Sequence, residues 1–109
     1  METLSSSFKI PYYAVIFTSQ KRDNDGYQAM ATRMDELAAL QPGYLGVESI
    51  TNNDHGITIS YWQSKEDIHA WKQNLEHVGA QTSGKKAWYQ EYQVRICKVE
   101  RSYGFKTKL

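Results

Sequence analysis

The chain has 109 residues, a length typical of a single domain with one hydrophobic core. Its formal net charge is +1, which argues against nucleic acid or an anionic membrane surface as the principal partner. The single cysteine, Cys97, rules out an internal disulfide and agrees with a reducing compartment. No stretch has the apolar length of a signal-peptide core or a membrane span, so we expect a cytoplasmic protein.

The first regular element is predicted to be a central strand. Residues 1–11 are polar and Ser-rich, and we expect them to be a flexible N-terminal segment. Tyr12–Phe17 is an unbroken run of apolar and aromatic residues, whose β-branched content favours a strand. Because this strand is apolar on both faces, the sheet should be covered on both sides. Thr18–Arg22 is expected to return the chain to solvent.

A helix and a hairpin should follow. Apolar residues recur at steps of three and four from Tyr27 to Ala38, which predicts an amphipathic helix that ends before Pro42-Gly43. Tyr44–Thr51 has the composition of a second strand. Asn52–Gly56 is rich in turn residues and predicts a hairpin loop.

The stretch from Gly56 to Trp71 predicts a strand that runs directly into a helix. Side chains alternate between apolar and polar from Ile57 to Tyr61, as in a half-buried strand. Ser64 followed at the third position by Asp67 indicates a helix N-terminus. Beyond this cap, an apolar stripe at helical spacing should lie against the preceding strand; its members are Ile68, Trp71, Leu75 and Val78.

The C-terminal third of the sequence has a less regular pattern. Two glycines interrupt the second helix, and Lys85–Tyr92 is expected to resume as a short helical piece. Gln93–Arg101 is predicted to be the last strand. The domain is expected to cover residues 12–105, followed by a basic C-terminal tail at residues 106–109.

The predicted order is β-α-β-β-α-β, which indicates an α+β, ferredoxin-like subunit. In that arrangement a four-stranded antiparallel sheet carries both helices on one face. The other face would then expose a large apolar patch, which soluble monomers rarely do. A second copy stacked sheet to sheet would bury it, so we expect a two-fold symmetric homodimer.

Three segments together resemble a known family: PGYLGVES (42–49), GITISYWQSKEDIHAWKQNLEH (56–77) and WYQEYQVRICKVERSYGF (88–105). They are similar to the antibiotic biosynthesis monooxygenase (ABM) superfamily of dimeric α/β barrels, from about Tyr12 to Phe105, most specifically over Tyr61–Trp71. The resemblance implies a ferredoxin-like subunit paired into a barrel. Family members include cofactor-independent oxygenases of aromatic or quinol-type compounds, heme-degrading enzymes and proteins without an assigned activity.

The heme-degrading branch matches this chain poorly. That branch uses a histidine and a tryptophan on the second helix and an asparagine on the first strand. Trp71 matches the tryptophan, but the histidine position falls near Gln81, and His77 comes one helical turn earlier. The first strand has no asparagine. Heme degradation is therefore a minority hypothesis, and no cofactor or metal site is expected.

The cofactor-independent branch requires an aromatic pocket, polar groups that orient a phenol or quinol, and a base. We predict three catalytic residues: His77, Asn74 and Trp71. The predicted substrate-binding residues are Trp62, Trp88, Tyr89, Gln81 and Arg95.

Structural roles compete with each of these assignments. Trp71 lies on an amphipathic stripe and is a core candidate, Trp62 is either a pocket wall or a dimer contact, and His77 is either a base or a surface residue. Arg95 either stabilises an anion or pairs with Glu91 or Glu48. A non-catalytic dimer that binds a small apolar ligand or acts as a stress accessory protein is the alternative function.

Overall fold

The structure is a computed structural model that describes residues 7–22, 27–77 and 89–107. Its elements follow the predicted β-α-β-β-α-β order. The elements are β1 (Tyr12–Lys21), α1 (Tyr27–Ala39), β2 (Tyr44–Asn52), β3 (His55–Trp62), α2 (Lys65–His77) and β4 (Tyr89–Val99).

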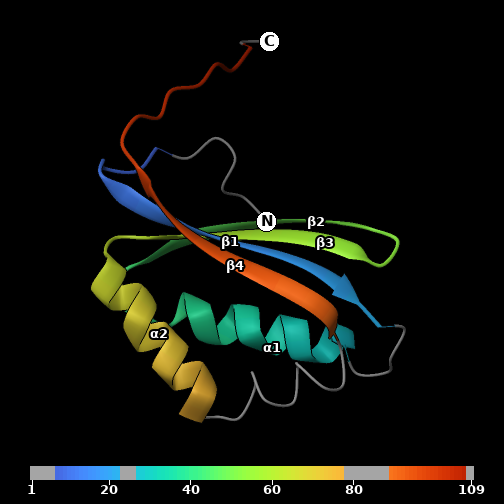
Figure 1. Ribbon diagram of the computed structural model, residues 1–109. Helices are drawn as coiled ribbons and strands as arrows, with labels where there is room; N and C mark the ends of the chain where they lie inside the picture. The colour runs from blue at the N-terminus through green and yellow to red at the C-terminus, as the bar shows by residue number, and fades with distance from the viewer. Residues whose placement is uncertain (1–6, 23–26, 78–88, 108–109) are drawn as a thin grey trace.

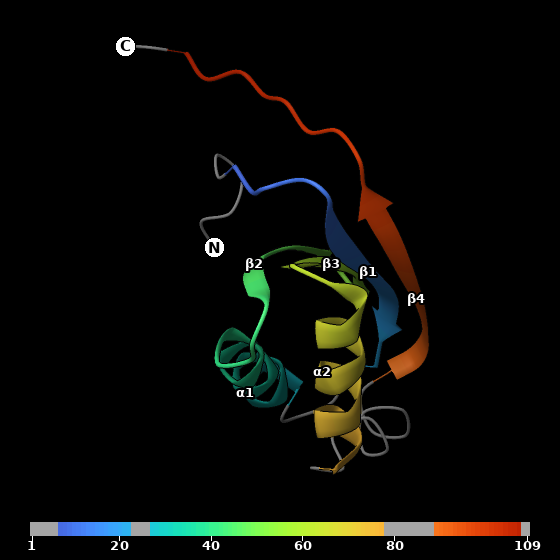
Figure 2. The ribbon, with the colours of Figure 1, turned by 90° about the vertical axis from the view of Figure 1, so that its left-hand side faces the viewer.

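The strands form one four-stranded sheet in the order β2-β3-β1-β4, and every pair is antiparallel. Both helices pack on one face of this sheet, as Figure 2 shows. The predicted ferredoxin-like α+β fold is confirmed. Within the described ranges, no helix combines the length and apolarity needed to span a bilayer.

The first strand is longer than predicted. Residues 18–21 were expected to leave the sheet, but they pair with β4, and residues 18–20 also pair with β3. Gln20 lies opposite His55 on one side and Glu91 on the other. The strands on both sides of β1 extend to the same end of the sheet and supply hydrogen-bond partners for its polar residues. The polarity of the side chains does not predict this backbone pairing.

The helical piece predicted for Lys85–Tyr92 was wrong over its described part. β4 begins at Tyr89, and residues 85–88 lie outside the described residues. Pairing of Tyr89 with Lys21 and of Tyr92 with Ser19 draws the segment into the sheet. The Phe17 ring contacts both tyrosine rings, so tertiary packing overrides the local helical pattern. β4 ends at Val99, two residues before the predicted limit.

The core lies between the sheet and the helices. Its buried members are Ala38 of α1, Trp62 of β3 and Ile68 of α2. Trp62 is 0% exposed. Half-buried residues pack around this cluster: Tyr13, Val15, Tyr44 and Trp71. The prediction that the apolar stripe of the second helix packs on the strand before it is confirmed for Ile68 and Trp71. Val78, its last predicted member, lies outside the described residues.

The junction between β3 and α2 is closed by a predicted cap and by a turn. The Ser64 hydroxyl accepts a hydrogen bond from the Asp67 backbone N–H (3.1 Å) and donates one to the Asp67 carboxylate (2.8 Å). Gly43, with φ of +81°, lies directly against that carboxylate. The Gly43 carbonyl also accepts a hydrogen bond from the Gln63 backbone N–H at 2.8 Å. The start of β2 is thus fastened to the start of α2.

Gly43→Ala should destabilise the protein, because it adds a left-handed backbone penalty to a clash with the Asp67 side chain. We expect a loss of about 1–3 kcal/mol in the free energy of unfolding, measured by urea denaturation. Gly56→Ala is the matched control, since a Cβ there meets only ordinary contacts. Equal effects of the two substitutions would contradict this account of the junction.

The face of the sheet opposite the helices is called here the open face. An aromatic cluster of Phe8, Tyr12 and Tyr61 lies at one end of it, with ring centroids 5.3 to 5.9 Å apart. Ile50 and Ile57 lie further along and are 74% and 49% exposed. Apolar side chains therefore lie on both faces of the sheet, although the helices cover only one.

Candidate functional site

Two stacked tryptophans join β3 to α2. The rings of Trp62 and Trp71 lie 6.2 Å apart with an interplanar angle of 25°. Tyr44 packs edge-on against Trp62 at 5.6 Å. The Trp62 Nε1–H donates to the Ser60 hydroxyl at 2.9 Å, which satisfies the one polar group of a fully buried ring. Trp62 thus faces the helices, and its burial excludes the expected alternative of a dimer contact.

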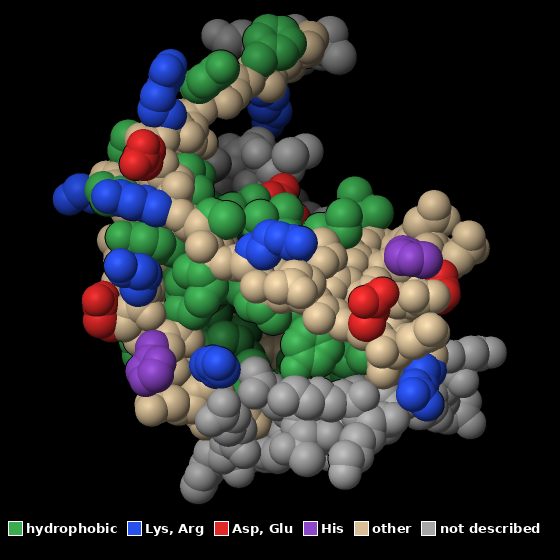
Figure 3. Space-filling model, viewed as in Figure 1, with side chains coloured by type: hydrophobic (Ala, Val, Ile, Leu, Met, Phe, Trp, Pro, Cys, Tyr) green, Lys and Arg blue, Asp and Glu red, His purple; other side chains and the backbone are tan. Residues whose placement is uncertain are grey.

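Beside this pair, the covered face of the sheet is incompletely filled by the described residues. Strand register places Val94 opposite Phe17 and Ile96 opposite Val15, so both side chains lie on the face that carries the helices. They nevertheless remain 43% and 54% exposed. Figure 3 shows a recess lined by hydrophobic side chains below β4 and beside α2. We call this space the β4 recess.

Three tyrosines gather near the first residues of β4. The Tyr89 ring contacts Phe17 at 5.4 Å, Tyr27 of α1 at 5.7 Å and Tyr92 at 5.7 Å. Burial, with a contribution from the hydrogen bond to Tyr27, raises the pKa of the Tyr89 phenol strongly. Tyr89 therefore stays neutral and acts as a hydrogen-bonding phenol rather than as a base.

Asp35 of α1 is a candidate that sequence reasoning missed. Burial is the main reason that the pKa values of Tyr44 and Tyr89 are raised, and the charge of Asp35 adds a smaller contribution to both, so the carboxylate lies within electrostatic reach of these two tyrosines. Partial burial raises the pKa of Asp35 itself, although the side chain keeps contact with solvent. An accessible carboxylate with a raised pKa is a better proton acceptor than an ordinary surface aspartate.

A sequence signal for Asp35 exists. The residue is four positions after Ala31 and three before Ala38, which places it at the edge of the apolar stripe of α1, where its side chain stays exposed. A charged residue at the edge of an apolar stripe can lie near the packed layer while it remains open to solvent.

The predicted site residues do not all come together. Asn74 is half-buried and lies one helical turn beyond Trp71, on the same side of α2. His77 is the last residue of α2, and its side chain lies outside the described part, as do Gln81 and Trp88. Tyr89 lies at the start of β4, on the helix-covered face.

Arg95 lies on the other side of the sheet from Trp62, Trp71 and Tyr89. It alternates with Val94 and Ile96 and therefore points to the open face, where its guanidinium donates to the Thr18 hydroxyl at 3.4 Å. Pairing with Glu91 or Glu48, the alternative expected from the sequence, does not occur among the described ion pairs. The residue is exposed, so in this subunit it does not line the space beside Trp71.

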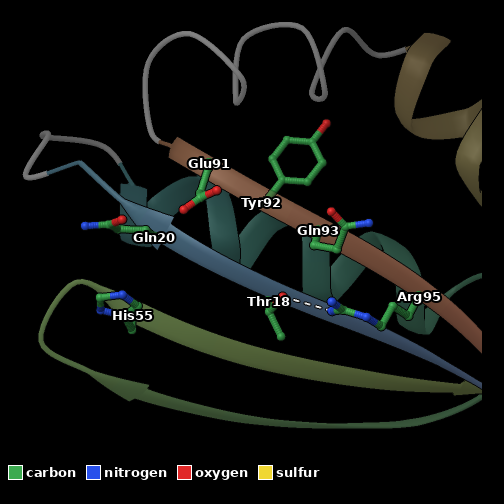
Figure 4. Close-up of a pocket in the computed structure, with 7 residues that line it drawn as sticks. All are labelled: Thr18, Gln20, His55, Glu91, Tyr92, Gln93 and Arg95. Atoms are coloured by element: carbon green, nitrogen blue, oxygen red, sulfur yellow. Dashed lines mark hydrogen bonds between the residues drawn. The ribbon is translucent and has the colours of Figure 1, made fainter.

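A second, polar hollow of about 300 Å³ lies on the open face. Figure 4 shows its lining residues: Thr18, Gln20, His55, Glu91, Tyr92, Gln93 and Arg95. The Tyr92 ring points away from His55 and Gln20. At its edge, Gln20 donates to Asp54 at 2.8 Å and lowers the pKa of that carboxyl, which also contacts His55 at 2.8 Å.

The polar hollow fits an aromatic substrate less well than the β4 recess does. Its lining consists mainly of amide, hydroxyl and charged groups, and the Tyr92 ring points away from His55 and Gln20. In the described ranges, no three His, Cys, Asp or Glu side chains gather in a way that would hold a metal ion.

Comparison with solved structures assigns the fold to a class. A protein of Nitrosomonas europaea assigned to the antibiotic biosynthesis monooxygenases superimposes with a TM-score of 0.73 at 10% identity, over 91% of this chain and 100% of the other. SnoaB of Streptomyces nogalater, a cofactor-independent oxygenase, gives 0.72 at 8% identity, over 84% and 96%. The subunit thus has the fold of the ABM superfamily, as its sequence resemblance implied.

The family itself follows from the sequence. Residues 16–98 match the model of the monooxygenase af470-like family, and the chain belongs to that family. The uncharacterized protein YqjZ of Bacillus subtilis is 50% identical over 103 residues, covering 93% of this chain and 90% of that protein.

Ser60→Ala should remove the acceptor of the buried Trp62 Nε1–H and leave that donor unsatisfied. We expect a loss of about 1–3 kcal/mol in the free energy of unfolding. Near-UV circular dichroism should also change, because the orientation of Trp62 against Trp71 relaxes. Ser60→Thr keeps the hydroxyl and is the control. An unchanged spectrum and stability in Ser60→Ala would show that this hydrogen bond does not position the ring.

Proposed function

We propose that the protein is an ABM-type monooxygenase that oxidises a small aromatic or quinol-like compound without a bound cofactor. The observation that carries this proposal is the half-buried Trp71 ring, stacked on the buried Trp62, together with the exposed apolar side chains of the β4 recess. Flat aromatic walls with a few polar groups at the margin suit a planar, hydroxylated ring. The cofactor-independent activity of SnoaB, which shares the fold, supports the same chemistry.

The proposed reaction needs no external reductant. A phenol or quinol bound in the recess loses a proton to the protein, and the resulting anion is electron-rich enough to transfer electrons to oxygen. At an activated methylene carbon, one oxygen atom becomes the new carbonyl oxygen. The other leaves as water with the two hydrogens that the carbon has lost. The protein contributes binding, orientation and removal of the proton.

Two residues are proposed as the proton acceptor. His77 at the end of α2 has the residue type that accepts protons near neutral pH, and Asn74 beside Trp71 would orient the substrate hydroxyl. Asp35 is the second candidate, because burial raises its pKa while the side chain stays accessible. The two candidates predict different acid limbs of the pH profile of kcat/KM. A histidine places that limb near neutrality, and a carboxylate places it at lower pH.

Metal-free protein should consume oxygen when it is given a panel of quinols, followed with an oxygen electrode. If His77 is the base, His77→Ala should lower the rate of oxygen consumption by about 10²- to 10⁴-fold. If Asp35 is the base, Asp35→Asn should have that effect. Asn74→Ala should raise KM more than it lowers kcat. His69→Ala is the matched control, because His69 is an exposed histidine on the same helix.

No oxygen uptake above background across the panel would count against the oxygenase. Quenching of tryptophan fluorescence by the same compounds, without turnover, would then favour the alternative of a non-catalytic ligand-binding protein. A strong visible absorption band on titration with heme would instead support the minority heme-degrading hypothesis.

The proposed working form is a cytoplasmic homodimer stacked through the open faces. Ile50 and Ile57 are 74% and 49% exposed there, and Phe8 and Tyr61 add partly exposed aromatic rings, whereas Tyr12 is 7% exposed. Burial of such a surface by an identical one is the usual basis of two-fold dimers. Arg95 and the polar hollow would lie in or beside this interface rather than in the β4 recess.

A further inference from the structure

One edge of α2 faces β4 and carries two lysines. The opposite edge is identified by Asp67, whose side chain lies directly against Gly43 at the start of β2. β2 and β4 are the outer strands on opposite sides of the sheet, so the remaining edge of α2 faces β4. Lys65 lies three residues before Ile68 and Lys72 lies four residues after it, which places both lysines on that edge.

A third lysine approaches the same space from the sheet. Lys98 of β4 pairs with Tyr13, which packs against the core between sheet and helices. Residues directly opposite in an antiparallel pair project to the same face, so Lys98 lies on the covered face. It follows Ile96 by two residues and Val94 by four, and therefore ends the row of apolar β4 side chains that lines the β4 recess.

These three lysines, called here the basic rim, have no described counter-charge. All three are exposed, and neither of the two ion pairs among the described residues includes any of them. Figure 3 shows Lys or Arg side chains at the margin of the hydrophobic recess. The whole chain has a formal net charge of only +1, so this concentration of positive charge comes from the arrangement of the fold rather than from composition.

An apolar floor with cations at its margin suits an amphipathic anion. A lysine can lay its hydrocarbon stem along an apolar surface and keep its ammonium group in water. A carboxylate that meets the ammonium at the margin forms a charge-assisted hydrogen bond without full desolvation, which would be costly. A ring attached to that carboxylate would reach the apolar side chains below.

We infer that the β4 recess selects planar aromatic compounds that carry a carboxylate. The ring lies against Val94 and Ile96, the carboxylate is bound by Lys72 and Lys98, and Lys65 adds to the positive potential of the rim. This inference rests on the proposed function, because it names the substrate class of the same site. The rim lysines bind and select the substrate, and they take no part in removing its proton.

Two matched pairs of compounds test the selection in isothermal titration calorimetry at low ionic strength. They are 4-hydroxybenzoic acid with 4-hydroxybenzamide, and 1-hydroxy-2-naphthoic acid with 1-hydroxy-2-naphthamide. Within each pair the shape is nearly constant and only the acid is an anion. We expect the acid of at least one pair to bind about tenfold more tightly than its amide, with a preference that falls as salt is added.

The rim variant is the double substitution Lys72→Gln with Lys98→Gln. It should abolish the preference for the acid and leave the affinity for the amide unchanged, because both lysines are exposed and glutamine keeps most of the side-chain length. The matched control, Lys9→Gln with Lys106→Gln, removes the same charge from exposed positions outside the helices and the sheet. It should keep the preference. Loss of the preference in both variants would show a general charge effect and overturn the inference.

Methyl NMR spectra locate the bound acid. The Val94 and Ile96 methyl signals should shift on titration, because an aromatic ring in the recess lies against them. Shifts of the His55 ring without shifts of these methyls would place the anion in the polar hollow and overturn the inference.

The binding measurements separate this inference from the proposed function, since they need no turnover. Equal affinities for acid and amide, or no binding of either acid, would overturn the selection, and oxygen uptake with uncharged quinols would still support the oxygenase. A preference for the acid that depends on Lys72 and Lys98, without oxygen uptake from any quinol, would support the selection and count against the oxygenase.

Discussion

Burial of Trp62 is the packing event on which the arrangement of this subunit depends. The ring is 0% exposed and contacts β2 through Tyr44 and α2 through Trp71. Ser60, two residues earlier on the same face of β3, holds its only polar group at 2.9 Å. A side chain of this size, fully desolvated and hydrogen-bonded, has few alternative positions, so the elements around it have few alternatives as well.

The same packing leaves two different surfaces on the two faces of the sheet. On the covered face, α2 is held against Trp62, and Val94 and Ile96 remain exposed in the β4 recess. On the open face, the aromatic cluster and exposed isoleucines suit a flat partner of the same shape. Proposed catalysis and proposed assembly therefore use opposite faces. Substitutions in one should leave the other intact, which makes the two proposals separable by experiment.

The fold is shared far more widely than the residues that fill it. Structures with 8% and 10% identity superimpose with TM-scores above 0.7. Since the backbone is retained while most side chains differ, the fold by itself does not define a reaction. The test of function therefore lies with single residues such as Asp35, Trp71 and Asn74 rather than with the architecture.

The sequence by itself determined the element order, the Ser64–Asp67 cap and the stripe of α2 that packs on β3. Hydrophobic periodicity and helix capping depend on residues that are only a few positions apart in the chain. Long-range pairing decided the rest. The polar end of β1 and the residues from Tyr89 joined the sheet because strands distant in sequence supplied their hydrogen-bond partners. Tertiary structure also placed Arg95 on the open face, away from Trp71, and brought Asp35 near Tyr44 and Tyr89. The sequence gives the chemistry of each side chain, but only the tertiary structure determines which side chains from distant parts of the chain lie next to it.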